Sequence, residues 1–226
     1  MALDIEALVT YPMESDDWFV TVLIGTVLTL LSVFIIPGIL MYGYLVRVLR
    51  AGMDDAPEPP AFGDWGSLFV EGLVAAVILF VYQLIPLVVF AVTVGGSLAA
   101  IATGSRVGAG VGMAGLFGGL ALSVVLALVF SYVGLVGVAN YAREGRIGAG
   151  FDVGVIIDVG TDGAYAIPWA VGVLVLIVAS VVGGIPILGQ AVLFYALIVA
   201  MRVVGQGFAD ARGLDGSTSP GAGVTV

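Results

Sequence analysis

Four long stretches of the chain carry no charged residue, and their positions indicate its architecture. They cover residues 18–46, 72–105, 107–142 and 163–201. Each is longer than the roughly 18 apolar residues that suffice to cross a bilayer. The pattern therefore predicts an all-α, polytopic helical membrane protein.

The number of spans depends on where these stretches turn. As one helix, residues 163–201 would be about 58 Å long, roughly twice the hydrocarbon thickness, so Gly183-Gly184-Ile185-Pro186 predicts a turn. Similar breaks at Ile36-Pro37-Gly38 and Ile85-Pro86, with recurring acidic starts and arginine- and glycine-containing ends, predict three hairpins and six transmembrane helices. The alternative takes residues 18–46 as one tilted, proline-kinked span and gives five.

The segments outside the apolar stretches complete the organisation. Residues 1–17 hold five acidic residues and no basic one, which predicts an acidic interfacial segment and not a secretory signal. The membrane domain is expected over residues 18–210, with polar connections at 51–66 and 143–162. Residues 211–226 are rich in glycine, serine and threonine and are expected to form a flexible tail.

The seven arginines are the only basic residues, and they indicate the orientation. In both span counts only Arg106 falls on the opposite side from the other six. The positive-inside bias predicts a multi-pass protein of the cell membrane with a cytoplasmic carboxyl terminus; the amino terminus is inside for six spans and outside for five. Two pairs at helix ends are the candidate contacts for lipid headgroups. These pairs are Arg47 and Arg50, and Arg143 and Arg146.

The composition excludes several kinds of chemistry. The chain has no cysteine, histidine or lysine, so thiol nucleophiles, thiolate zinc sites, imidazole bases and Schiff-base lysines are absent. No acidic residue lies inside the four apolar stretches, which disfavours ion-coupled transport. We therefore expect a non-enzymatic protein without cofactor or metal. A net charge of −9 predicts a halophilic, archaeal habitat and argues against nucleic acid as a partner.

Some polar and small residues stand out within the apolar stretches. Gln83, Gln190 and Asn140 are the candidate intramembrane polar contacts, because buried amides bond across helices. Glycines at one-turn spacing predict close helix packing, within one chain or between copies in a homo-oligomer. They are Gly104, Gly108, Gly112, Gly115 and Gly119. The GxGxxG match at residues 110–115 lies between two membrane stretches, a context that excludes a nucleotide-binding fold.

Four segments carry a resemblance to a known family. They are GYLVRVLRAG (43–52), EPPAFGDWGSLFVEGL (58–73), NYAREGRIGAGF (140–151) and VVGQGF (203–208). With Asp17-Trp18 before an apolar helix, they make the chain resemble the domain-of-unknown-function 4013 family over roughly residues 8–210. That family of archaeal and bacterial membrane proteins implies a helical membrane fold and supplies no activity.

Two functions of different classes follow from these observations. The first is a structural, accessory or lipid-organising role, with membrane lipids and a second copy or another membrane protein as partners. The alternative is a facilitative transporter or channel for a small solute, which requires Gln83, Gln190 and the glycines near Gly112 to line one water-accessible cavity. An intramembrane enzyme would need carboxylates such as Glu71 and Asp162 to converge in one cleft.

Overall fold

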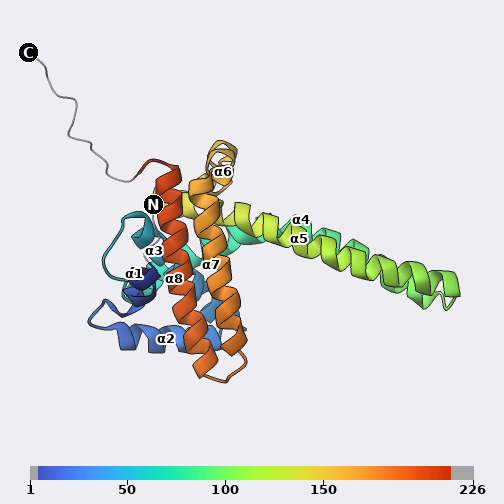
Figure 1. The fold of residues 1–226 in the computed structure, drawn as a ribbon, viewed down its shortest axis with the longest axis horizontal. Helices are drawn as coiled ribbons and strands as arrows, with labels where there is room; N and C mark the ends of the chain where they lie inside the picture. Colours follow the sequence, from blue (N-terminus) through green and yellow to red (C-terminus); the bar gives the residue numbers. More distant parts are fainter. Residues whose placement is uncertain (1–4, 215–226) are drawn as a thin grey trace, which may run out of the picture.

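The computed structural model describes residues 5–214, and every regular element in this part of the chain is a helix (Figure 1). The all-α prediction is therefore confirmed. The predicted tail, residues 211–226, lies mostly outside the described residues. In chain order the helices are α1 (Ile5–Thr10), η1 (Tyr11–Met13), α2 (Trp18–Leu30), α3 (Ile35–Met53), α4 (Trp65–Ala102), α5 (Arg106–Glu144), η2 (Ile147–Phe151), α6 (Val153–Gly160), α7 (Gly163–Val182) and α8 (Leu188–Ala211).

Acidic residues start several of these helices, as the recurring acidic pattern suggests. The carboxylate of Asp64 accepts a hydrogen bond from the backbone at the start of α4, and those of Asp152 and Asp162 do the same for α6 and α7. Each carboxylate satisfies an amide that has no partner within its helix and lies at the positive end of the helix dipole. At the other end of α5, Gly145 adopts φ 71°, the left-handed conformation that commonly ends a helix.

Three helical hairpins are present: α2 with α3, α4 with α5, and α7 with α8. Within residues 5–214, five helices are long and apolar enough to cross a membrane: α3, α4, α5, α7 and α8. Helix α2 has 13 residues, about 20 Å, which is short of a hydrocarbon thickness of about 30 Å. It lies crosswise to α7 and α8 (Figure 1). Residues 18–46 are therefore two separate helices and not one kinked span.

One predicted turn is confirmed and two need correction. The turn at Gly183–Pro186 does separate α7 from α8. The break expected at Ile85-Pro86 is wrong, because α4 continues through Pro86 to Ala102. Proline is tolerated inside membrane helices where other groups compensate for the missing hydrogen bond. The first hairpin turns at residues 31–34, and Pro37 lies in the first turn of α3, where the missing N–H costs nothing.

The main core forms where α3, the first half of α4, the last part of α5 and helices α6 to α8 meet. Its fully buried side chains include Leu49, Ile78, Val136, Tyr165 and Phe208. The phenol oxygen of Tyr82 donates to the Gly150 carbonyl at 2.8 Å, and that of Tyr132 donates to the Gly160 carbonyl at 2.8 Å. These two bonds fasten the base of the α4–α5 hairpin to η2 and α6.

A second core lies between α2, α3, α8 and the amino-terminal helices. The ring of Tyr44 stacks on Phe62 at 4.1 Å and tilts against Phe194 at 5.5 Å. Phe62 in turn stacks on Trp65 at 5.9 Å. The segment around Trp65 is thus the start of α4, and Leu68 one turn later is fully buried in the same core.

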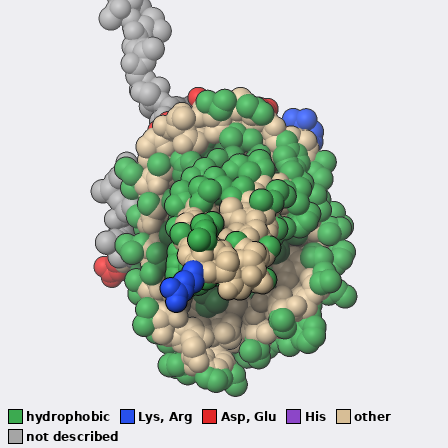
Figure 2. Space-filling view, turned by 90° about the vertical axis from the view of Figure 1, so that its right-hand side faces the viewer, with side chains coloured by type: hydrophobic (Ala, Val, Ile, Leu, Met, Phe, Trp, Pro, Cys, Tyr) green, Lys and Arg blue, Asp and Glu red, His purple; other side chains and the backbone are tan. Residues whose placement is uncertain are grey.

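Beyond Tyr82 and Tyr132, α4 and α5 leave the rest of the molecule as a paired rod (Figure 1). We call residues 83–131 the distal hairpin. None of its residues belongs to the core clusters found within residues 5–214. Its outer faces are apolar, with Val92, Val107 and Phe117 each more than 60% exposed. Figure 2 looks along this hairpin and shows hydrophobic side chains over most of the facing surface.

Candidate functional site

The most polar part of the described protein is the end at which α3, α4, α5 and α8 meet the connection at residues 54–64. We call it the arginine end. Arg47 and Arg50 of α3 share the carboxylate of Glu71 on α4, at 3.1 Å and 3.4 Å. Arg47 also donates to the Gly63 carbonyl at 2.7 Å, and Arg50 donates to the Ala142 carbonyl at 2.8 Å. Two arginines of one helix thus bind α4, its preceding loop and the end of α5.

Exposure separates the two arginines. The side chains of Arg47 and Glu71 are 17% and 18% exposed, whereas that of Arg50 is 38% exposed. The guanidinium of Arg47 donates to the Glu71 carboxylate and to the carbonyls of Gly63 and Asp64, so few of its N–H groups remain for an outside ligand. Arg50 keeps a more accessible edge that faces outward beside the end of α5.

A third arginine closes the other side of this end. Arg202 of α8 donates to the Ala56 carbonyl at 2.5 Å and pairs with Asp55 at 3.2 Å. Its guanidinium lies 3.8 Å from the centre of the Tyr11 ring, a cation–π contact. The Tyr11 hydroxyl donates to the Glu58 carbonyl at 3.0 Å. Burial raises the pKa of Tyr11, and the Arg202 charge opposes part of that rise, so this phenol stays a neutral donor at ordinary pH.

The remaining arginines divide as their positions in the sequence suggest. Arg143 and Arg146 lie exposed at the end of α5, and Arg146 pairs with Glu144. Arg212 at the end of α8 pairs with Asp158 of α6 at 3.4 Å. Arg106 begins α5 at the tip of the distal hairpin, far from the arginine end (Figure 1). Six arginines therefore gather at one end, although most of them bind protein atoms there.

The candidate intramembrane amides lie in different places. Gln83 donates to the Ala127 carbonyl at 3.4 Å across the α4–α5 pair. Asn140 is 1% exposed and donates to the Ala149 carbonyl at 2.9 Å, which holds η2 against α5. Gln190 is half-buried in the first turn of α8.

Four of the five candidate glycines of the distal hairpin lie against α4. A Cβ atom built on Gly112 would lie 2.6 Å from the Ser97 carbonyl, and one on Gly119 would lie 2.5 Å from Thr93. Gly108 and Gly115 are similarly crowded by α4 and the turn. Gly104 has a different role, since its φ of +67° forms the turn itself. The four helical glycines thus lie where the two helices of the hairpin approach each other closely.

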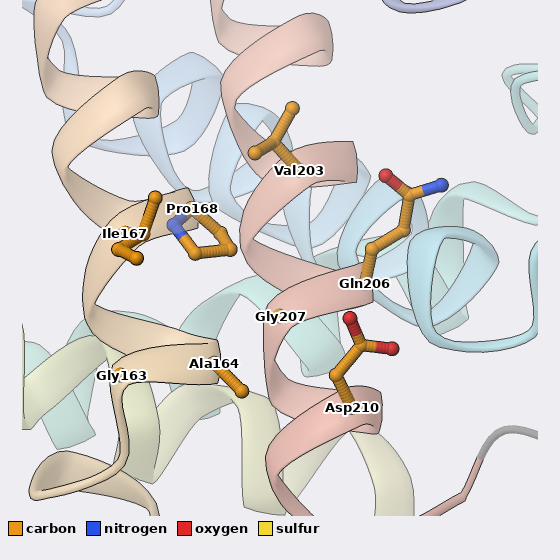
Figure 3. A pocket seen from close by; sticks show the side chains of 8 residues that line it. All are labelled: Gly163, Ala164, Ile167, Pro168, Val203, Gln206, Gly207 and Asp210. Atoms are coloured by element: carbon orange, nitrogen blue, oxygen red, sulfur yellow. The ribbon is translucent and has the colours of Figure 1, made fainter. Parts of the chain in front are cut away.

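Three cavities are relevant to a possible ligand. One, of about 130 Å³, lies between α7 and α8, and its polar groups are Gln206 and Asp210 (Figure 3). Another, of about 220 Å³, lies where the distal hairpin leaves α7 and α8 and is lined mainly by apolar side chains. The third, of about 330 Å³, is an apolar groove on the distal hairpin beside Gln83 and Ser123. Gln190 lines none of the three.

The two candidate carboxylates, Glu71 and Asp162, are engaged in structural contacts. Glu71 is held by two arginines, while Asp162 caps α7. Within residues 5–214 no group of three or more acidic side chains is placed to hold a metal ion. The two carboxylates that an enzyme would need are thus each occupied in a different contact.

Sequence reasoning missed Arg202 and Glu71 as the partners that close the arginine end. The signal for Glu71 was present, since it is the only charged residue of α4 and directly precedes an apolar stretch. Its partners, Arg47 and Arg50, could not be predicted, because they depend on the tertiary packing of α3 against α4.

A comparison with protein families places the chain. The family described as protein of unknown function, DUF4013, matches residues 20–188, about three quarters of the chain. The chain belongs to the DUF4013 family. The match includes the Arg47–Glu71 network and the whole distal hairpin, and it ends at the start of α8, before Arg202. No curated protein and no solved structure shows a match to this DUF4013 protein.

Proposed function

We propose that this DUF4013 protein is a non-enzymatic structural component of the cell membrane that organises the lipids around it. The observation that carries this proposal is the distal hairpin, whose apolar outer faces belong to none of the core clusters found within residues 5–214. Helices that expose apolar side chains on their outer faces require lipid or another apolar partner. A long apolar rod attached to a packed body suits a protein that acts through its membrane surface.

The arginine end supplies the headgroup contacts in this proposal. Arg50, Arg143 and Arg146 are the accessible members, whereas Arg47 is committed to Glu71 and the Gly63 carbonyl. Guanidinium groups bind phosphate oxygens in pairs, so anionic lipid headgroups are the chemistry they fit. We place this end, and with it the carboxyl terminus, on the cytoplasmic side. The acidic excess over the rest of the polar surface fits a habitat of high salt.

The transporter alternative has less support. It requires the polar residues of the membrane region to line one path, but Gln83 faces a groove on the distal hairpin and Gln190 lies at the start of α8. A cavity that joins them does not occur among the three described above. A lipid-facing role needs no such path.

The experiment compares lipids that stay bound after purification at high salt. The double variant Arg143→Gln with Arg146→Gln removes two accessible charges at the arginine end, while Arg106→Gln removes one charge at the tip as a control. Mass spectrometry should show that the double variant retains less anionic lipid per protein than wild type and that Arg106→Gln retains a similar amount. Equal retention by all three would overturn the lipid-organising role.

The same samples test the alternative. Wild-type protein reconstituted into liposomes should leave the permeability to small neutral solutes at the level of protein-free liposomes. A saturable solute flux that Gln83→Leu abolishes would replace the lipid-organising role with facilitated transport.

A further inference from the structure

Two apolar arms of this molecule run in directions that a flat bilayer does not accommodate together. The distal hairpin projects crosswise to the α7–α8 pair (Figure 1). Residues 83–102 of α4 and the 20 residues of α7 are each about 30 Å long, which is one hydrocarbon thickness. If either arm crosses the bilayer along its normal, the other lies in the membrane plane. An arrangement in which both arms cross requires a bend between them.

The backbone hydrogen bonding of α4 is interrupted near the base of the distal hairpin, where such a bend is needed. At the base of the hairpin, Tyr82 of α4 and Tyr132 of α5 donate hydrogen bonds to the carbonyls of Gly150 and Gly160 and so attach the hairpin to η2 and α6. One turn beyond Tyr82 comes Pro86, which has no N–H to donate to the Tyr82 carbonyl and so interrupts the hydrogen-bond ladder of α4.

The facing part of α5 is weakened as well. Ser131 directs its hydroxyl to the Leu128 carbonyl at 2.8 Å, a back-bond that competes with the helix and often bends it. Gly134 follows, and glycine is a poor helix former inside a helix. Both helices of the pair thus have a soft point beside the base of the hairpin. We call residues 82–86 and 131–134 the joint.

An open cavity lies on the inner side of this joint. It has a volume of about 220 Å³ and is bounded by Leu79 and Ser131 on the hairpin side and by Trp169 and Leu176 on α7. Beyond the cavity the same side of α7 continues toward the α7–α8 turn, and Ser180, one turn after Leu176, is exposed there. A hairpin that swings over the cavity would cover this side of α7.

We propose that the joint is a hinge, and that in a bilayer the distal hairpin folds down alongside α7, closing the cavity. The segment that covers the cavity side of α7 is thus part of the same chain. The driving force is the need of both arms to cross the hydrocarbon layer, and van der Waals packing between the helices adds to it. Arg106 at the hairpin tip and the turn at residues 183–187 then reach the same membrane surface, opposite the arginine end.

The inference rests on the membrane location that the proposed function assumes, but not on any lipid specificity. The absence of cysteine allows a direct test, because two introduced cysteines are the only labelling sites. Ser105→Cys lies at the tip of the distal hairpin, and Ile185→Cys lies in the α7–α8 turn. Spin labels at these positions report how far the two arms are apart.

The two arrangements predict well-separated distances. Arms of about 30 Å at right angles place their tips about 40 Å apart, whereas packed helices lie about 10 Å apart before the label arms are added. In lipid nanodiscs we expect a main population near 10–20 Å and a disulfide between the two cysteines on mild oxidation. Only the long distance, with no cross-link, would overturn the hinge.

Two variants separate hinge motion from a general effect on folding. Pro86→Ala restores the N–H at the joint and should shift the distance distribution toward the long value, by at least a twofold loss of the short population. The matched control is Pro168→Ala, which removes the other proline that lies inside a long helix, but within α7. It should leave the distribution unchanged; a similar shift in both variants, or in neither, would overturn the role of the joint.

A second measurement covers the case in which Pro86→Ala does not fold. Ser131→Phe places a ring in the cavity and should lower the yield of the disulfide at least twofold without a change in helix content. An unchanged yield would count against closure over this cavity. Retention of lipid is unaffected by either outcome, so failure of the hinge is distinct from failure of the proposed function.

Discussion

The closest helix contact in the body, between α3 and α4, gives the sharpest prediction for stability. A Cβ atom on Gly43 would lie 1.9 Å from the Leu68 carbonyl oxygen, and one on Gly72 would lie 1.8 Å from the Ile39 carbonyl oxygen. In Gly43→Ala the helices must therefore separate by about 1.5 Å to reach the 3.4 Å at which ordinary van der Waals contact begins. The obstacle is a backbone atom, which has no rotamer by which to move away.

The expected cost follows from that geometry. Overpacking of a tight site costs about 1–3 kcal/mol, and this site belongs at the upper end because backbone opposes backbone. Alanine returns about 1 kcal/mol through its higher helix propensity. The separation also stretches the 3.1 Å contact between Arg47, one turn along α3, and Glu71. We expect a net loss of about 2 kcal/mol, or a melting temperature lower by about 4–8 °C.

The assay is thermal unfolding in mild detergent, followed by circular dichroism. The control is Gly118→Ala, because a Cβ at Gly118 meets nothing within 4 Å. That variant should be neutral or more stable by up to about 1 kcal/mol. The reasoning fails if Gly43→Ala melts at or above the temperature of Gly118→Ala.

Other contacts give further expectations that the same methods check. Glu71→Gln leaves two arginines without their counter-charge and should cost about 2 kcal/mol in thermal unfolding, whereas Glu144→Gln, whose partner is largely exposed, should cost less than about 0.5 kcal/mol; equal costs would contradict the burial argument. Arg202→Met should release the connection at residues 54–64 and speed its cleavage by protease, and an unchanged rate would show that the clamp is dispensable. Gly112→Leu should open the distal hairpin and increase its hydrogen exchange; exchange equal to wild type would argue against close packing.

Sequence patterns predicted the helical class, the turn at Gly183–Pro186 and the glycine packing of the distal hairpin, because each depends on local features: hydrophobic run length, a glycine–proline turn, and one-turn spacing. They failed at Pro86, where α4 continues through the proline. A proline does not end a membrane helix when neighbouring groups compensate for the missing hydrogen bond. They also missed that α2 is short and crosswise. Helix α2 packs on α8 through Gly25, where a built Cβ would lie within 2.3 Å of the Phe194 ring, and such a tertiary contact leaves no local pattern in the sequence.

The candidate site was predictable only in part. That arginines gather at one end follows from the arginine positions and the turns between them. Some arginines bind protein atoms such as the Glu71 carboxylate and the Ala142 carbonyl, and others stay accessible. The packing of α3 against α4 and α5 decides which arginines reach these atoms. Exposure of a charge is a property of the fold, so sequence alone assigned the same role to Arg47 and Arg143.

The bonds at the arginine end also imply an order of assembly during synthesis. Arg47 meets Glu71 only 24 residues later, Arg50 meets the Ala142 carbonyl 92 residues later, and Arg202 meets the Ala56 carbonyl across 146 residues. A nascent chain that has inserted its first hairpins thus still lacks the contacts of Arg202 with Asp55 and Ala56 at the start of the connection at residues 54–64, and α8 supplies them. We expect a chain truncated before Arg202 to lose these contacts and to be cleaved faster by proteases near Asp55 and Ala56.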